Sequence, residues 1–214
     1  MLKLYDYFRS GAAYRTRIAL NLKGLDYEQS SIHLTRDGGE QFSEDYAVLN
    51  PQNLVPTLID GDATLIQSMA IMEYLEDAYP DPSLLPAGAG PRARVRALAN
   101  IVACDIHPVN NLRVRLYLIN EMGVSKDGQK QWMENWIHLG FKAYEALLAD
   151  DATGRFSHGD TPGMADACLI PQIANARLNK VNIDRFPRIL EIDAAAAGHE
   201  AFQRSLPANQ PDAE

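Results

Sequence analysis

A proline- and glycine-rich stretch is the feature that most constrains what this chain can fold into. Residues 80–91 hold Pro80-Asp81-Pro82 and then Pro-Ala-Gly-Ala-Gly-Pro at 86–91, a composition typical of a stiff linker and unsuited to helix or strand. Strand and helix patterns alternate before this stretch, and only helical periodicity follows it. The sequence therefore predicts two domains, residues 1–80 and 92–214, joined by a linker over 81–91.

The first domain is predicted to be α/β. Its first strand is broken at Arg9-Ser10-Gly11, and the helix after the break is closed by Gly24. Strands joined through helices run parallel, whereas the hairpin turn at 60–62 joins antiparallel strands, so one mixed sheet is expected. In chain order the expected elements are strands 3–8, 27–34, 56–59 and 63–66, with helices 12–23, 40–49 and 67–79.

The second domain is predicted to be all-helical. A proline at position 108 interrupts its first helical pattern, which should kink the helix and free the carbonyl of Cys104. The tail at 207–214 is expected to be loose. The expected helices are 92–120, 128–148, 164–179 and 187–197.

Composition and charge exclude several classes of function. The net charge of −8 argues against nucleic acid or an acidic membrane surface as a partner. The only cysteines, Cys104 and Cys168, both read as buried small hydrophobes and provide neither a disulfide framework nor a metal cluster. We therefore expect a protein that uses no metal. The sequence has no membrane-length apolar run and no signal-peptide pattern at the N-terminus, so we also expect it to be cytoplasmic.

Ser10 lies between the first strand and the first helix, where unpaired N–H groups and the helix dipole favour an anion such as a thiolate. The alternative is that Ser10 only caps the helix. Val55-Pro56 leaves a similar choice: a cis peptide bond would present the Val55 backbone to an extended peptide ligand, and a trans bond is the commoner case. Gln67-Ser68, opening another helix, can cap it or hold a carboxylate.

Together these segments match one pattern. Tyr7-Phe8-Arg9-Ser10 before a helix, then Asn50-Pro51 and Val55-Pro56, then Gln67-Ser68 followed by Glu73-Tyr74-Leu75, resemble the glutathione transferase superfamily. The resemblance to its zeta class extends nearly end to end. It rests on the serine-bearing first turn, Asp37-Gly38-Gly39, residues 104–113 (CDIHPVNNLR) and the ending Pro207…Asn209-Gln210-Pro211-Asp212.

This resemblance implies a thioredoxin-like N-terminal domain, an all-α C-terminal domain and glutathione as cofactor. It implies that Ser10 hydrogen-bonds the glutathione sulfur, that Val55 pairs with the cysteinyl backbone, and that Gln67 and Ser68 hold the γ-glutamyl carboxylate. Ser10 and Arg9 would be catalytic. The remaining residues implied for the glutathione pocket are Gly11, Ala12, Arg15, Gln41, Pro56, His107, Asn111 and Arg113.

The chain departs from the fullest zeta motif, Ser-Ser-Cys-Ser, because it reads Ser10-Gly11-Ala12-Ala13. Without that cysteine, glutathione is left as the only thiol nucleophile. With no cysteine before position 104, dithiol redox chemistry of the glutaredoxin kind is also excluded. The Gly163-Met164-Ala165-Asp166 turn is interpreted as a structural helix cap.

Candidate substrate-binding residues lie in both domains. His107 can face a ligand at the predicted kink or be satisfied by its own helix. Arg9, Arg113 and Arg177 can be solvated, but the zeta resemblance makes them candidates for binding a dicarboxylate through planar bidentate donors.

The zeta class contains maleylacetoacetate isomerase and bacterial maleylpyruvate isomerases. The resemblance therefore implies a homodimeric enzyme that uses glutathione to isomerise a maleyl dicarboxylate, maleylacetoacetate first of all, as in tyrosine and phenylalanine catabolism. A thiolate adds to the cis double bond and departs once the resulting single bond has rotated. The alternatives are maleylpyruvate as substrate, general transferase activity on xenobiotic electrophiles, and a non-catalytic binding protein that keeps the fold.

Overall fold

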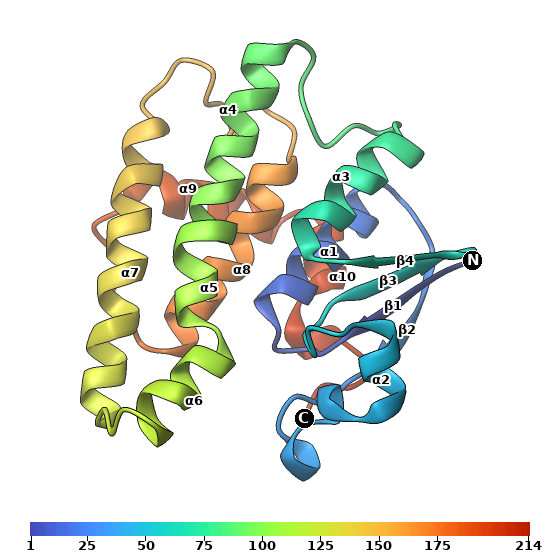
Figure 1. The fold of residues 1–214 in the computed structure, drawn as a ribbon. Coiled ribbons are helices and arrows are strands. Elements are labelled where there is room, and N and C mark those ends of the chain that lie inside the picture. The colour runs from blue at the N-terminus through green and yellow to red at the C-terminus, as the bar shows by residue number, and fades with distance from the viewer. The chain divides into compact units, whose positions relative to one another are not determined.

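A computed structural model describes residues 1–214, which fall into two compact units (Figure 1). The first contains residues 1–84 together with 198–214, and the second contains residues 85–197. The division predicted from sequence placed residues 92–214 together, whereas the contacts group the last 17 residues with the N-terminal part of the chain. None of the helices is both long and apolar enough to cross a membrane.

The first unit is built on a four-stranded mixed sheet in the order β2-β1-β3-β4. Strand β1 pairs parallel with β2 and antiparallel with β3, and β3 pairs antiparallel with β4. The connections predicted the β1–β2 and β3–β4 pairs, but β3 runs opposite to β2 although a helix links the two strands. The strands are β1 (Leu2–Asp6), β2 (Tyr27–Ser31), β3 (Thr57–Asp60) and β4 (Ala63–Ile66).

Helices cover both faces of this sheet. Alternation along β1 turns Leu2, Leu4 and Asp6 inward, and Asp6 pairs with Arg17 of α1 on that side. Tyr5 points the other way and meets Tyr46 of α2, their ring centroids 6.1 Å apart. The helices of this unit are α1 (Gly11–Leu22), α2 (Glu44–Leu49), α3 (Ser68–Ala78) and α10 (Glu200–Ser205).

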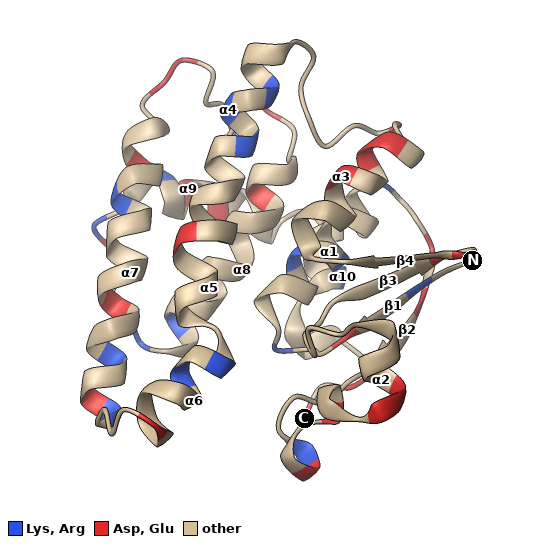
Figure 2. Ribbon diagram, viewed as in Figure 1, with Lys and Arg blue, Asp and Glu red and all other residues tan.

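The predicted helix over 40–49 is only partly helical. A 3₁₀ turn occupies Glu40–Phe42, and Ser43 then takes an extended conformation. Its side chain accepts the N–H of Tyr46, so α2 begins at Glu44. Figure 2 shows the acidic first turn of α2, formed by Glu44 and Asp45, which the positive end of the helix dipole favours.

The second unit is helical throughout. Its core is formed by apolar side chains at helical spacing, such as Val102 and Ile106, which face Ile137 and Phe141 among the fully buried residues. Figure 2 marks the basic positions along α4 in blue. The helices are α4 (Ala89–Asn100), a π-helix (Ile101–Ile106), α5 (His107–Asn110), α6 (Leu112–Asn120), α7 (Lys126–Leu147), α8 (Met164–Leu178) and α9 (Pro187–Ala197).

The predicted single helix over 92–120 is therefore wrong in its continuity. Pro108 has no N–H to donate, and the chain widens into the π-helix just before it. Asn111 is then extended and caps α6. The prediction that Cys104 is buried is also wrong: Val102 and Ile106 occupy the inward positions, so Cys104, two residues from each, is exposed. Cys168 is buried as predicted.

The prediction of a loose tail fails for a different reason. Residues Pro207–Asn209 form a 3₁₀ turn, Gln210 is buried, and Asp212 accepts hydrogen bonds from two segments of the sheet domain. Polar side chains fix this tail, so the absence of apolar periodicity did not indicate that it is ordered.

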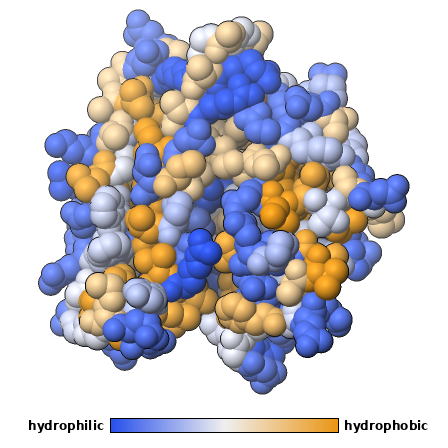
Figure 3. Space-filling view, in the orientation of Figure 1, coloured by the Kyte–Doolittle hydropathy of each residue, from blue (hydrophilic) through white to orange (hydrophobic).

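The face of the molecule seen in Figure 3 is largely hydrophilic, with apolar side chains interspersed.

Candidate functional site

The strand register of the first unit collects three of the predicted segments at one end of the sheet. Tyr5 lies opposite Thr57 and Thr57 lies opposite Ile66. The turn that leaves β1, the segment that enters β3 and the segment that leaves β4 are therefore neighbours. These segments carry Ser10, Val55-Pro56 and Gln67-Ser68 respectively, so residues 57 positions apart in sequence share one site.

Ser10 is the N-cap of α1. Its backbone is extended, with φ −70° and ψ 119°, and its Oγ accepts the N–H of Ala13 at 3.2 Å. Capping uses Oγ as an acceptor, and the hydroxyl hydrogen has no acceptor within the protein. The capping alternative is thus correct but incomplete, since the same hydroxyl still has a proton to donate at the positive end of a helix.

The turn that presents Ser10 is closed by a hydrogen bond from the Ser10 N–H to the Tyr7 carbonyl, 2.9 Å long. Behind it, Tyr7 and Phe8 are buried in an apolar cluster with Tyr46 and Val55. One cluster therefore supports both the Ser10 turn and the segment that enters β3.

The Val55-Pro56 peptide bond is cis. The preceding residue is anchored from α2: the carbonyl of Leu54 accepts the Tyr46 hydroxyl at 2.6 Å and the Asn50 amide at 2.7 Å. Burial raises the pKa of Tyr46, so the hydroxyl stays protonated and keeps donating. The backbone N–H and C=O of Val55 itself have no hydrogen-bond partner within the protein, so they are available to an extended ligand.

Gln67 and Ser68 open α3. Gln67 has a left-handed φ of 69° and makes no capping hydrogen bond, while its amide donates to Gln52. An unbranched, non-glycine residue at this φ is strained, and such strain is concentrated at ligand sites. Ser68 is buried as the first helical residue, where the N–H groups lack acceptors within the helix.

Gln41 is approached closely by the backbone of Gly39. A Cβ at Gly39 would lie 2.5 Å from the Gln41 amide nitrogen, and Gly39 has a φ of 111°. Gln41 donates to the Leu34 carbonyl at 3.3 Å, yet its buried Oε1 has no partner. A buried polar atom without a partner is costly, so this oxygen marks a place where a ligand or water is expected.

The other first-unit candidates surround Ser10. Arg9 is exposed and its guanidinium lies 4.9 Å from the centre of the Phe8 ring. Arg15 is 2% exposed, so it is part of the packed helix. Gly11 and Ala12, in the first turn of α1, are half-buried.

The second unit holds the remaining candidates. His107 begins α5, and Arg113 is exposed on α6 and makes no ion pair. Asn111 is committed to capping α6, since its Oδ1 accepts the N–H of Val114 at 3.1 Å. Arg177, on α8, already has a carboxylate partner, because its Nη2 lies 2.6 Å from Asp193 Oδ2.

Comparisons with known proteins agree with this arrangement. A family model described as the glutathione S-transferase N-terminal domain matches residues 1–77. A maleylpyruvate isomerase of Ralstonia sp is 50% identical over 212 residues, which is 99% of each chain. The solved structure of a maleyl pyruvate isomerase described as a bacterial zeta-class glutathione S-transferase is 50% identical, with a TM-score of 0.96 over 99% of this chain and 100% of that one.

The chain belongs to the zeta class of the glutathione transferase family.

Another zeta-class neighbour carries ligands. The maleylacetoacetate isomerase of Methylobacterium extorquens AM1, solved with bound malonate and GSH, is 39% identical with a TM-score of 0.94 over 99% of each chain. The first unit of the present chain offers groups that match glutathione. A hydroxyl donor at a helix start suits a thiolate, an unpaired peptide group suits the cysteinyl backbone, and the start of α3 suits a carboxylate.

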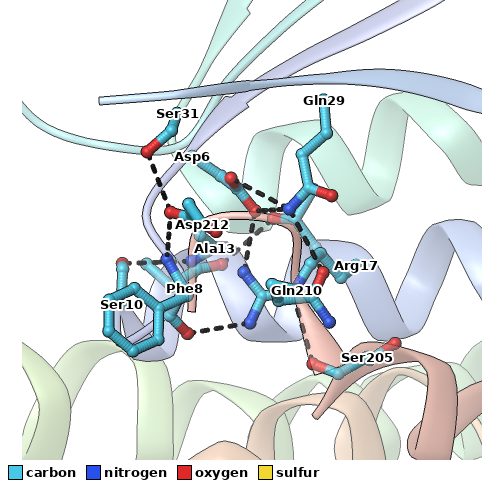
Figure 4. A network of polar contacts seen from close by, with 12 residues as sticks. Asp6, Phe8, Ser10, Ala13, Arg17, Gln29, Ser31, Ser205, Gln210 and Asp212 are labelled. Atoms are coloured by element: carbon cyan, nitrogen blue, oxygen red, sulfur yellow. Dashed lines mark hydrogen bonds and ion pairs between the residues drawn. The ribbon is translucent and has the colours of Figure 1, made fainter. Parts of the chain in front are cut away.

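Sequence reasoning missed several polar residues that the structure singles out. Asn110 is buried with both amide atoms unpartnered, whereas the prediction named Asn111; the N-cap signal of Asn111 before Leu112 was the available clue. Asp6, Arg17 and Asp212 brace the Ser10 turn (Figure 4). Asp212 was named only as part of the zeta-class ending, and none of the three was given a role, because their partners lie outside the local sequence.

Asp166 behaves as the sequence analysis proposed. Its carboxylate accepts the N–H of Gly163 and of Ser157, each at 2.9 Å. It is buried in the second unit, and burial raises its pKa. Both oxygens are used in holding the start of α8, so Asp166 is a structural cap.

Proposed function

We propose that this chain is a glutathione-dependent cis–trans isomerase acting on a maleyl dicarboxylate, either maleylacetoacetate or its shorter analogue maleylpyruvate. The observation that carries the proposal is the Ser10 hydroxyl. It caps α1 with its oxygen and keeps a free hydrogen at the same end of the sheet as the unpaired Val55 backbone and the strained Gln67. Relatives that bear both substrate names support the choice of substrate class.

In this proposal the first unit binds glutathione. When bound, glutathione supplies a thiolate that adds to the cis double bond and leaves after the new single bond has rotated. Ser10 donates to the sulfur and thereby lowers the thiol pKa. Val55 pairs with the cysteinyl backbone, and Gln67 with Ser68 holds the γ-glutamyl carboxylate. Gln41 adds its unpartnered oxygen to the pocket, where it accepts a hydrogen bond from the ligand.

Substrate recognition is assigned to Arg9 and Arg113. Both are exposed, neither has a carboxylate partner, and each offers a planar fork of donors. Arg177 is the weaker candidate because Asp193 already occupies its guanidinium. The same arginines would stabilise the negative charge that develops on the substrate when the thiolate adds.

The deciding experiment follows the disappearance of maleylacetoacetate and of maleylpyruvate, each with and without glutathione. We expect at least one of the two substrates to be turned over. This turnover should depend wholly on glutathione and should leave the glutathione concentration unchanged. Consumption of glutathione in proportion to product would favour the general transferase alternative. Binding of glutathione without turnover of either substrate or of a neutral electrophile would favour a non-catalytic binding protein.

Assembly and cellular role complete the proposal. We expect a homodimer without nucleic acid or membrane partners, in the cytoplasm, serving the breakdown of tyrosine and phenylalanine or of other aromatic compounds. The zeta-class membership supports these expectations. Sedimentation analysis of the purified protein tests the dimer.

A further inference from the structure

The C-terminal segment is a sequence motif that the proposed function leaves without a role. Residues 205–212, here called the strap, run behind the Ser10 turn (Figure 4). We propose that Asp212 is a positioning residue that fixes the backbone of Phe8 and, through it, the direction of the Ser10 hydroxyl. The inference rests on the proposed function, in which Ser10 donates to the glutathione sulfur.

The backbone of Phe8 is held through both its N–H and its carbonyl. Its N–H donates to Asp212 Oδ2 at 3.1 Å, and its carbonyl accepts Nη2 of Arg17 at 3.0 Å. Ser10 is two residues further along, tied back to Tyr7 by the turn hydrogen bond. A hydrogen bond weakens steeply as its angle falls, so a small rotation of this turn misdirects the Ser10 hydroxyl.

Asp212 takes the place of a strand neighbour. The ladder between β1 and β2 ends with Asp6 opposite Ser31, and the last backbone bond runs from the Ile32 N–H to the Asp6 carbonyl at 2.7 Å. The buried Phe8 therefore has no strand partner for its N–H. The side chain of Asp212 supplies the acceptor and also accepts the Ser31 hydroxyl at 2.9 Å, which links the turn to the end of β2.

The strap itself is anchored to the same buried ion pair that holds Phe8. Arg17 Nη1 lies 2.7 Å from Asp6 Oδ2, with both side chains fully buried, and Arg17 Nε donates to the Ser205 carbonyl at 3.2 Å. The Gln210 side chain donates to the carbonyls of Arg204 and Leu206 and accepts from Gln29 at 3.1 Å. Displacement of the strap is therefore resisted at several points.

The chemistry of Asp212 indicates a role beyond packing. Its second oxygen, Oδ1, is buried and has no hydrogen-bond partner. Burying an unpartnered carboxylate oxygen lowers the stability of the fold, so stability alone does not account for this residue. Its negative charge disfavours a nearby thiolate, so any assistance to Ser10 comes from geometry. Asparagine has the same shape, keeps an oxygen for the Phe8 N–H and carries no charge, and so separates positioning from charge.

The test compares Asp212→Ala, Asp212→Asn and Asn209→Ala. Asn209 is the matched control, because its amide donates to the Gln203 carbonyl at 2.8 Å within the C-terminal segment and does not touch the turn. The measurements are the pKa of the bound glutathione thiol from the ultraviolet absorbance of the thiolate, kcat at saturating glutathione, the KM for glutathione, and the Tm.

For Asp212→Ala we expect the thiol pKa to rise by about 0.5–1 unit, part of the roughly one to two units that a hydrogen bond to an anion is worth. The kcat near neutral pH should fall about 3–10-fold, with the KM for glutathione nearly unchanged because the γ-glutamyl contacts are remote. Asp212→Asn should retain the thiol pKa at or slightly below the original value. Asn209→Ala should lower only the Tm.

A lower Tm in Asp212→Ala with an unchanged thiol pKa and kcat would overturn the inference. If that variant does not fold, Ser31→Ala replaces it, since it removes the second hydrogen bond to the same oxygen from an exposed position. A smaller shift in the same direction supports the inference, and no shift overturns it. Ser10→Ala is measured beside them: if its thiol pKa is unchanged, the proposed role of Ser10 fails first, independently of the strap.

Discussion

Ser10 performs two separable tasks, and two substitutions can distinguish them. As a cap it accepts the Ala13 N–H at 3.2 Å, and replacement by alanine should destabilise the protein by about 0.5–2 kcal/mol. Replacement by glycine costs only a few tenths of a kcal/mol at a cap, because the open backbone is solvated. Neither variant has a hydroxyl to donate to the glutathione sulfur.

The magnitude of the catalytic effect follows from the lost donor. A hydrogen bond to a charged group is worth about 1.5–3 kcal/mol, or roughly one to two pKa units. Both Ser10→Ala and Ser10→Gly should therefore raise the bound thiol pKa by that amount. At a pH below both pKa values the thiolate fraction, and with it kcat, should fall about 10–100-fold, and the rate should recover as the pH rises through the new pKa.

The assay is a pH–rate profile at saturating glutathione together with thermal unfolding of both variants. We expect equal shifts of the profile in the two variants, and a lower Tm mainly in Ser10→Ala. If Ser10→Gly kept the original profile, the hydroxyl would not act on the thiol, and Ser10 would be a helix cap alone.

Three further predictions concern the rest of the site and its scaffold. Arg113→Met should lower kcat/KM for a maleyl substrate about tenfold or more, as expected for loss of a charged hydrogen bond, and should leave kcat/KM for a neutral electrophile unchanged. Glu191→Gln, which alters an exposed ion pair elsewhere, is the control. Equal loss of both activities in Arg113→Met would refute the assignment. Gln67→Ala should raise the KM for glutathione at nearly constant kcat, and a collapse of kcat at fixed KM would contradict it. Glu76 is almost fully buried beside Lys23, 3.1 Å away. Burial by itself raises the pKa of Glu76, but hydrogen bonds from Ser83, the Leu84 N–H and Lys23 outweigh it and lower the pKa below 4.5. Its contribution to stability is therefore present above its usual pKa and lost as the pH falls through the lowered value. The free energies of unfolding in denaturant of Glu76→Gln and of the original protein should differ most at neutral pH and converge as the pH is lowered. A difference in unfolding free energy that does not change with pH would contradict this.

Local chemistry let the sequence determine much of this protein. The strand–turn–helix opening with its cap at Ser10 and the hairpin before Gln67-Ser68 both depend on residues within one turn of each other. The Pro/Gly stretch was predicted to be a linker up to residue 91, but α4 already begins at Ala89. The parallel β1–β2 pair and the antiparallel β3–β4 hairpin follow from the connections. The antiparallel β1–β3 pair, which gathers Ser10, Val55 and Gln67 at one end of the sheet, was decided only by the tertiary structure. The likeness to the zeta class then supplied the chemistry.

Only the tertiary structure decided the features that depend on distant partners. Asp212 meets Phe8 across 204 residues of sequence and Arg17 meets Ser205 across 188, so the tail that reads as loose is in fact fixed. Gly140 is unfavourable for a helix by propensity, yet a Cβ there would lie 2.3 Å from Ile106 of the π-helix. Arg177 reads as a free cation until Asp193 is found beside it. Periodicity reports which face of an element is apolar, but it does not record which polar groups are brought together when those faces pack.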